Sequence, residues 1–178
     1  MTRTSPGAAT PTAGAPATGP DTGTQARTIA DSAATTAFRE HIAQVDTEAE
    51  DRAVARQHAK GKQTARERID SLLDSGTFLE IGRYTGSGAG AGARPSGVVT
   101  GFGQIDGRQV AVYSQDFSVS GGALGTIEGD KIVRLLDDAL RLRIPVIGLI
   151  DSGGAKIQEG VGALRQYGRI FNRTCAAS

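Results

Sequence analysis

The stretch Ile144-Pro-Val-Ile-Gly-Leu-Ile-Asp-Ser-Gly-Gly-Ala-Lys-Ile-Gln-Glu-Gly160 decides the fold of this chain. Its first part, 144–150, is almost wholly apolar and rich in branched residues, which is typical of a strand covered on both faces. A turn at Asp151-Ser152-Gly153-Gly154 and then a polar helix start follow, so backbone N–H groups are left free at the end of a sheet. Such a turn either binds an anion or a developing oxyanion, or needs its glycines only for their dihedral angles.

Upstream of this stretch the sequence predicts a hairpin and a crossover helix. Residues 98–105 and 108–114 have the composition of strands, and Asp106-Gly107 between them is a strong signal for a two-residue turn. A glycine-rich turn at 121–125 leads into a helix, which we expect to become regular near Asp130 because Gly129 disfavours helix. The helix has apolar residues at helical spacing, namely Ile132, Leu135, Leu136, Ala139 and Leu140. A strand, a crossover helix and a second strand predict an α/β fold with parallel pairing.

The N-terminal part divides into a tail and a helical lead-in. Residues 1–30 are rich in Ala, Thr, Pro and Gly and lack large apolar side chains before Ile29, which predicts a disordered tail. We interpret 31–178 as one partial domain, with a helical lead-in at 36–74 and a core of strands and helices at 78–178. Within the lead-in, Thr64 followed three residues later by Glu67 predicts a capping box. The last segment, 161–178, is expected to be a helix interrupted at Gly162 and Gly168.

Composition excludes several classes of protein. With 38% hydrophobic and 4% aromatic residues the core must be aliphatic, and a net charge of +1 argues against a nucleic-acid or membrane-surface binder. No apolar run approaches the roughly 20 residues that a membrane span needs. The single cysteine, Cys175, cannot form an internal disulfide, which favours a cytoplasmic setting.

Three polar features of the chain are ambiguous. The cluster Lys60, Lys62, Arg66 and Arg68 lies around a helix start and is either a phosphate site or a solvated basic face. His41 and His58 lie in polar segments far from any cysteine or paired carboxylates, so we interpret them as solvated. The glycine-rich segment 86–92 has neither a strand leading into it nor a helix after it, so we interpret it as a mobile loop and not as a nucleotide-binding turn.

Three motifs resemble one family in the same order. They are Gly61-Lys-Gln-Thr-Ala-Arg-Glu-Arg-Ile-Asp70, Ser114-Gln-Asp-Phe-Ser-Val-Ser-Gly-Gly-Ala-Leu-Gly125 and the segment Asp151–Gly160. The chain from about Phe38 onward resembles the carboxyltransferase (beta) subunit of biotin-dependent acyl-CoA carboxylases, of the propionyl-CoA carboxylase type. The resemblance implies a crotonase-like spiral of ββα units, of which this chain is the N-terminal part of the first domain.

The resemblance also implies a reaction, in which a carboxyl group moves from carboxybiotin to the α-carbon of a short acyl-CoA. Donors for the enolate oxygen would lie at Gly153, Gly154 and Ala155. Gly121 and Gly122 would form the wall near the thioester, and Lys62 and Arg66 would bind coenzyme A phosphates. No metal and no Ser or His nucleophile is implied.

The resemblance implies partners as well. Biotin would arrive on a biotin carboxylase/biotin carboxyl carrier (alpha) subunit, and the intact family protein would be a hexamer. Because the resemblance places the biotin-side site in a second domain, we expect this chain to be inactive alone. The alternative is a non-catalytic fragment that binds coenzyme A or assembles with full-length subunits.

Two departures from the family pattern stand near the proposed site. Lys156 replaces the arginine expected after Ser-Gly-Gly-Ala, and Ile127-Glu128-Gly129 is atypical before the helix. A serine hydrolase is a weaker interpretation of Asp151-Ser152-Gly153-Gly154. That motif needs a positioned histidine, and both histidines lie in polar segments.

Overall fold

The computed structural model describes residues 35–37, 40, 51, 54–87 and 94–178. The chain divides into two compact units, Met1–Gln44 and Val45–Ser178. The described residues of the first unit, 35–37 and 40, are helical, and all further description concerns the second unit. The predicted disordered tail at 1–30 and His41 lie outside the described residues.

A mixed four-stranded sheet in the order β1-β4-β5-β6 is the centre of the second unit. Strands β4 (Val98–Ile105) and β5 (Arg108–Gln115) form the predicted antiparallel hairpin, with Ile105 opposite Arg108. Asp106 and Gly107 both have positive φ, 50° and 73°, as a tight two-residue hairpin turn requires. Strand β1 (Leu79–Ile81) adds antiparallel to β4, and β6 (Val146–Leu149) adds parallel to β5, as the sequence predicts. The prediction that β6 is covered on both faces is wrong, because it is the last strand of the sheet order and its residues are partly exposed.

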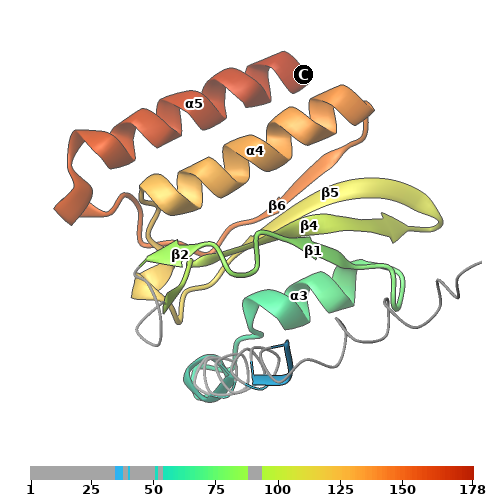
Figure 1. Cartoon of the computed structure of the whole chain (residues 1–178), viewed down its shortest axis with the longest axis horizontal. Coiled ribbons are helices and arrows are strands. Elements are labelled where there is room, and N and C mark those ends of the chain that lie inside the picture. Colours follow the sequence, from blue (N-terminus) through green and yellow to red (C-terminus); the bar gives the residue numbers. More distant parts are fainter. Residues whose placement is uncertain (1–34, 38–39, 41–50, 52–53, 88–93) are drawn as a thin grey trace, which may run out of the picture. The chain divides into compact units, whose positions relative to one another are not determined.

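Helices cover both faces of this sheet (Figure 1). Helix α3 (Ala65–Leu72) lies on one face, and α4 (Thr126–Leu142) lies on the other and connects β5 to β6. Helix α5 (Val161–Ala177) packs on the outer side of α4. Two short 3-10 helices, η2 (Ser120–Gly122) and η3 (Ile157–Glu159), precede α4 and α5.

The two faces of β5 supply two separate apolar layers. Val110 and Val112 pack with Ile69 of α3, whereas Ala111, between them in sequence, packs with Leu135 of α4. This alternation follows from the two-residue period of a strand. Strand β5 is therefore covered on both sides, which fixes its C-terminal end, the start of the segment that leads to the candidate site.

Two predicted helix details are wrong. Helix α4 begins at Thr126 and not near Asp130, and it includes Gly129. A Cβ on Gly129 would lie 2.3 Å from Cβ of Gln166, so glycine lets α5 approach α4 closely there. Helix α5 runs without interruption through Gly162 and Gly168, because its packing on α4 outweighs the low helix propensity of glycine.

The segments before β4 agree with the sequence at the capping box and differ from it at the start of the glycine-rich segment. The capping box is present, since Thr64 Oγ1 accepts the N–H of Glu67 at 3.1 Å and Glu67 Oε2 accepts the N–H of Thr64 at 2.7 Å. Strands β2 (Gly86–Ser87) and β3 (Arg94–Pro95) pair with each other, so the ends of the glycine-rich segment are held together. The predicted mobile loop, 86–92, is wrong for its first two residues, because Gly86 and Ser87 form β2 and pair with β3; residues 88–92 lie outside the described residues.

Candidate functional site

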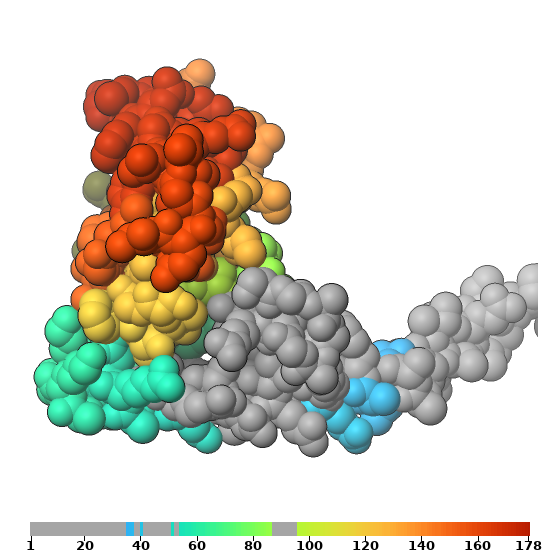
Figure 2. Space-filling model, turned by 90° about the vertical axis from the view of Figure 1, so that its left-hand side faces the viewer, coloured from blue at the N-terminus to red at the C-terminus, as the bar shows by residue number. Residues whose placement is uncertain are grey.

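Three segments far apart in the sequence meet at the C-terminal ends of β5 and β6. They are the segment before α3, the loop after β5 and the turn after β6. Figure 2 shows them stacked on one side of the molecule, in teal, yellow and orange respectively. Contacts of Lys62 with Asp151 and of Gly153 with Gly121 join them.

The turn after β6 is bonded along its length to the loop after β5. The N–H of Gly153 donates to the carbonyl of Gly121 at 2.8 Å, and the N–H of Leu124 donates to the carbonyl of Gly154 at 2.8 Å. The N–H of Lys156 then donates to the carbonyl of Leu124 at 3.0 Å, so Leu124 and Ala155 form a short parallel bridge. The two predicted glycine segments therefore lie side by side, as one rigid unit.

Gly122 is a position where only glycine fits. Its φ is +64°, in the left-handed region that side chains rarely adopt, and a Cβ there would lie 2.2 Å from the carbonyl oxygen of Asp151. Gly121 also has positive φ, +66°, but a Cβ on it would meet nothing within 4 Å. The close approach at Gly122 is what brings the two segments into contact.

The three predicted oxyanion donors differ in availability. The N–H of Gly153 is bonded to Gly121, and that of Gly154 donates to Ser152 Oγ at 3.1 Å. The N–H of Ala155 has no partner among the described residues. A donor that is already satisfied gives little to a ligand, so Ala155 is the member of the three that can bind a carbonyl oxygen without a rearrangement of the turn.

Lys62 reaches this turn from the segment before α3. Its Nζ lies 3.1 Å from Oδ1 of Asp151, and its side chain is 52% exposed. Lys60 and Lys62 both lie over the ring of Phe117, at 4.8 Å and 5.5 Å from its centroid. Two ammonium groups beside an aromatic ring, on the rim of the turn, form a positively charged surface that suits a phosphate.

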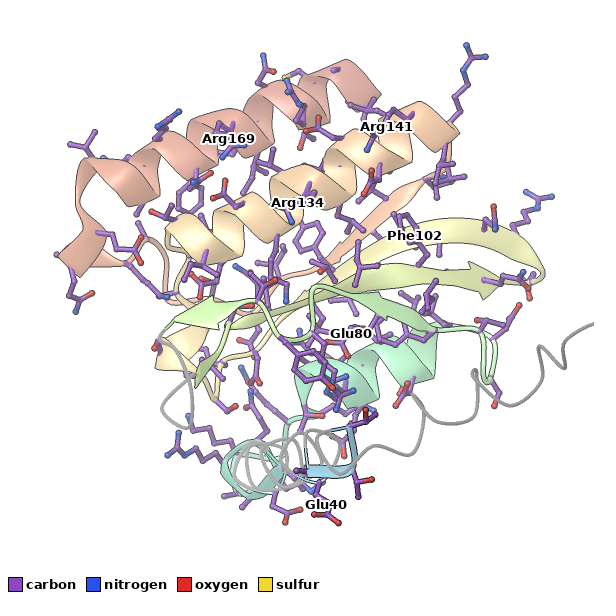
Figure 3. The ribbon with its side chains drawn as sticks, viewed as in Figure 1. Glu40, Glu80, Phe102, Arg134, Arg141 and Arg169 are labelled. Carbon is purple, nitrogen blue, oxygen red and sulfur yellow. The ribbon has the colours of Figure 1, made fainter. Side chains whose placement is uncertain are left out.

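Arg66 has a different environment. Its guanidinium forms a fork with the carboxylate of Glu80, at 2.8 Å and 3.1 Å, and Arg83 contacts the same carboxylate at 3.2 Å. Glu80 points from β1 toward α3, where Arg66 lies (Figure 3). The structure therefore brings Lys62 to the turn and ties Arg66 to the sheet. The other ambiguous polar residue, His58, is exposed and hydrogen-bonded to Glu67.

Sequence reasoning missed a buried carboxylate beside the turn. Glu128, in the first turn of α4, is 4% exposed in its side chain, and its oxygens lie 2.9 Å from Lys156 Nζ. It also accepts the N–H groups of Gly125 at 3.0 Å and Gly97 at 3.3 Å. An acidic residue in the first turn of a helix is a recognisable signal, because the helix dipole stabilises it there.

Two titratable groups near this carboxylate have shifted pKa values. Burial lowers the pKa of Lys131 to about 8, although Glu80 and Glu128 act in the opposite direction. The ammonium group of Lys131 donates to the carbonyl of Val98 at 2.6 Å. Hydrogen bonds from Thr126 lower the pKa of Glu159, whose Oε2 accepts the Thr126 N–H at 2.6 Å. The start of α4 thus carries two capping carboxylates, Glu128 and Glu159.

The described residues contain no group of three or more His, Cys, Asp or Glu side chains arranged to hold a metal ion. Within the same residues, no helix is long and apolar enough to cross a membrane.

Comparison with known proteins agrees with this geometry. The carboxyl transferase domain family matches residues 56–178. The propionyl-CoA carboxylase beta chain of Saccharopolyspora erythraea is 50% identical over 169 residues, which are 92% of this chain and 30% of that protein. The corresponding carboxyltransferase subunit of Haloferax mediterranei is 49% identical over 135 residues, 72% of this chain and 26% of that protein.

The similar solved structures are also those of carboxyltransferases. A transcarboxylase 12S structure with methylmalonyl-coenzyme A bound is 39% identical, with a TM-score of 0.70 over 78% of this chain and 29% of that one. The beta subunit of geranyl-CoA carboxylase from P. aeruginosa is 30% identical, with a TM-score of 0.66 over 79% of this chain and 27% of that one. These similarities confirm the predicted carboxyltransferase, crotonase-like α/β fold class.

The chain belongs to the carboxyl transferase domain family, the family of the beta subunits of biotin-dependent acyl-CoA carboxylases. It spans about 30% of the length of the first curated relative that it matches.

Proposed function

We propose that this chain forms the acyl-CoA side of a carboxyltransferase site, which accepts a carboxyl group from carboxybiotin onto the α-carbon of a short acyl-CoA, propionyl-CoA or acetyl-CoA. The observation that carries the proposal is the pair of bonded glycine segments, Gly121–Gly122 and Gly153–Gly154. The backbone N–H of Ala155 has no partner in the described part of the chain, and it lies in a turn whose other end is in contact with the exposed ammonium group of Lys62. In a coenzyme A thioester, the carbonyl oxygen can accept the Ala155 N–H and the phosphates can bind the Lys62 ammonium group.

The chemistry needs a donor at this place because the α-proton of a thioester is lost only if the enolate oxygen is stabilised. Hydrogen-bond donors fixed before the reaction stabilise that oxygen more than water does, since they need no reorganisation. In this role Ala155 donates, while the bonded N–H groups of Gly153 and Gly154 keep the turn rigid. Gly121 and Gly122 form the adjacent wall.

Lys62 is the residue that we assign to a coenzyme A phosphate. A phosphate can reach the ammonium group because the Lys62 side chain is 52% exposed, although the exchange leaves its present partner Asp151, which is 19% exposed, without its cation. Arg66 remains a predicted phosphate ligand, but binding there must compete with its fork to Glu80.

Carboxybiotin supplies the carboxyl group. We propose that it is carried to the site by a biotin carboxylase/biotin carboxyl carrier subunit, in a hexameric assembly such as the one named for transcarboxylase 12S. The resemblance assigns the biotin side of the site to a second domain, so the chain alone is expected to bind the thioester without carboxylating it. A cytoplasmic location stays a prediction.

A thermal melt of the purified chain with coenzyme A, propionyl-CoA or pantetheine tests the proposal. A ligand that binds only the folded state raises the melting temperature, and at equal concentration a tighter ligand raises it more. We expect an upward shift with coenzyme A and propionyl-CoA and little shift with pantetheine, which lacks the phosphates. A cooperative melt that neither coenzyme A nor propionyl-CoA shifts would overturn the acyl-CoA assignment.

The non-catalytic alternative has its own readout. Transfer of labelled carboxyl from a carboxylated biotin carrier to propionyl-CoA is measured for a full-length beta subunit alone, which gives the baseline rate, and again with this chain added. Coenzyme A binding by the chain with no transfer above that baseline would favour a binding or assembly role for this chain.

A further inference from the structure

A buried ion pair is attached to the residue directly after the candidate donor. Lys156 follows Ala155, and its ammonium group lies 2.9 Å from each oxygen of Glu128 in the first turn of α4. The Glu128 side chain is 4% exposed and that of Lys156 is 23% exposed. Removal of one partner from such a pair leaves the other charge buried without compensation, which destabilises the folded state.

The Glu128 carboxylate cannot move without loss of other bonds. Its Oε2 accepts the N–H of Gly125, where α4 begins, and its Oε1 accepts the N–H of Gly97, just before β4. A buried N–H that loses its acceptor carries a full desolvation cost. The carboxylate is thereby fixed to the sheet and to α4 at the same time, and Lys156 is fixed to the carboxylate.

The hydrogen bonds on either side of Ala155 determine where its own N–H points. On both sides of Ala155 the backbone is bonded to Leu124, through the carbonyl of Gly154 and the N–H of Lys156. In a parallel pairing, a strand bonds through alternate residues, so the intervening residue turns its own N–H away from the partner. The Ala155 N–H therefore points away from Leu124, and none of the residues that the structure describes accepts it, because Lys156 and Gly154 are held against Leu124.

We propose that Glu128 and Lys156 are positioning residues, which hold the Ala155 N–H as a fixed donor to the thioester oxygen of a bound acyl-CoA. This inference rests on the proposed acyl-CoA site. It also connects the two departures from the family pattern, since the atypical Glu128 and the unexpected Lys156 contact each other.

A purely structural role makes a different prediction. Glu159 also caps α4, through the Thr126 N–H, but it contacts Lys156 as well, through an ion pair at 3.9 Å and through its own N–H, which donates to the carbonyl of Lys156 at 3.0 Å. Capping of α4 and contact with Lys156 are therefore not separated by Glu159. If Glu128 acted only as a helix cap, its loss would lower stability and leave the environment of a bound thioester unchanged. The carbonyl spectrum of the bound thioester separates the two roles.

The experiment uses propionyl-CoA labelled with carbon-13 at its carbonyl, bound to the chain and observed by NMR and by infrared difference spectroscopy. A hydrogen bond to the carbonyl moves the carbon resonance downfield and lowers the stretching frequency. We expect both shifts in the wild-type chain and in Lys156→Arg, because the guanidinium fork can bond both oxygens of Glu128. Both shifts should disappear in Lys156→Met and Glu128→Gln.

Affinity gives a second readout in the same samples. In the two disrupting variants we expect propionyl-CoA affinity to fall about fivefold, the value of one ordinary hydrogen bond, with coenzyme A affinity unchanged. Arg173→Met is the matched control, because it also removes a cation that pairs with α4, through Asp137, far from the turn in sequence. Both disrupting variants carry a folding cost, because Lys156→Met leaves the buried Glu128 carboxylate unpaired and Glu128→Gln leaves one of its two backbone N–H donors without an acceptor. The two costs have different origins, so retention of the carbonyl shifts in either variant that folds would overturn the positioning role.

Each outcome decides something. Shifts that persist in Lys156→Met, in a chain that binds propionyl-CoA, would overturn the positioning role and leave the proposed function intact. Failure of the wild-type chain to bind either propionyl-CoA or coenzyme A would overturn the proposed function, and the positioning role with it. Loss of the shifts in Lys156→Met with their retention in Lys156→Arg and Arg173→Met would support the inference.

Discussion

Two ion pairs involve residues at the two ends of the same turn, and they differ in exposure. The inner pair joins Glu128, which is 4% exposed, to Lys156, which is 23% exposed, and its carboxylate is bonded to two backbone N–H groups. The outer pair joins Lys62, which is 52% exposed, to Asp151, which is 19% exposed. Buried pairs are costly to break, whereas exposed pairs contribute little to stability. The difference indicates that the inner pair sets the geometry of the turn and the outer pair is available for exchange with a ligand.

The largest expected effect on stability comes from Gly122, which contacts the turn after β6 at Asp151. Gly122→Val should destabilise the chain by about 3 kcal/mol or more, because the side chain meets the carbonyl of Asp151 and the backbone must keep a positive φ. Chemical denaturation measures this directly. Gly121→Val is the matched control, since it has a similar φ but no atom within 4 Å of its Cβ, and it should cost clearly less. Equal losses in the two variants would mean that the close contact at Gly122 is not what holds the turn.

The second effect concerns the buried residue Lys131, whose ammonium group donates to the carbonyl of Val98. Its pKa in the folded chain is about 8, below its ordinary value of 10.5, because burial disfavours the charged form. Between these two values the unfolded chain binds more protons than the folded chain, so stability rises with pH. Relative to Lys131→Met, the wild-type chain should gain about 2 kcal/mol between about pH 8 and about pH 10.

The comparison with Lys131→Met isolates one group, because the other titrations are common to both chains. Unfolding free energies are measured by urea titration across this range. A difference between the two chains that is flat with pH would show that the Lys131 ammonium group is not desolvated in the folded state.

The sequence predicted the strands and turns around the site better than it predicted which backbone N–H groups of the site are free to bind a ligand. The hairpin turn at Asp106, the parallel strand β6 and the two glycine segments all follow from local rules, since turn dihedrals and apolar runs are written in neighbouring residues. The state of each N–H group does not. The Gly153 N–H donates to Gly121, whereas the Ala155 N–H finds no acceptor in the described ranges, and this depends on a register between segments about thirty residues apart.

The ion pairs show the same limit. Lys62 and Arg66 are one helical turn apart and looked equivalent in sequence, but Lys62 meets Asp151, 89 residues away, and Arg66 meets Glu80, 14 residues away. The glycine at 129 was misjudged for a related reason, since contact with Gln166 of α5 outweighs its helix propensity. Tertiary contact decides each of these cases, and no local pattern encodes it.

The third prediction uses Arg66 to sharpen the distinction between the two cations. Arg66→Lys keeps the charge but loses the fork to Glu80, so we expect a loss of about 1 kcal/mol in stability. Coenzyme A affinity should change less than about twofold, because the charge that a phosphate would meet is retained and is already engaged. Calorimetric titration with coenzyme A checks this. A large loss of affinity with little loss of stability would place Arg66 at the phosphates after all.

The smallest effect on stability, and the most informative one for function, is expected from Lys62→Met. Because the Lys62 cation is 52% exposed while Asp151 is 19% exposed, loss of the pair should change the free energy of unfolding by less than about 1 kcal/mol. Coenzyme A affinity should nevertheless fall by about tenfold at low salt, and the deficit should shrink as salt is added, since an exposed charge acts on a phosphate through a screened field. Arg141→Met, which breaks the exposed pair with Asp138 on α4, is the control that should leave affinity unchanged. If both variants bound coenzyme A like the wild type, the outer pair would be an ordinary surface contact. The phosphates would then have to be bound elsewhere, while the role of the inner pair at Ala155 would be unaffected.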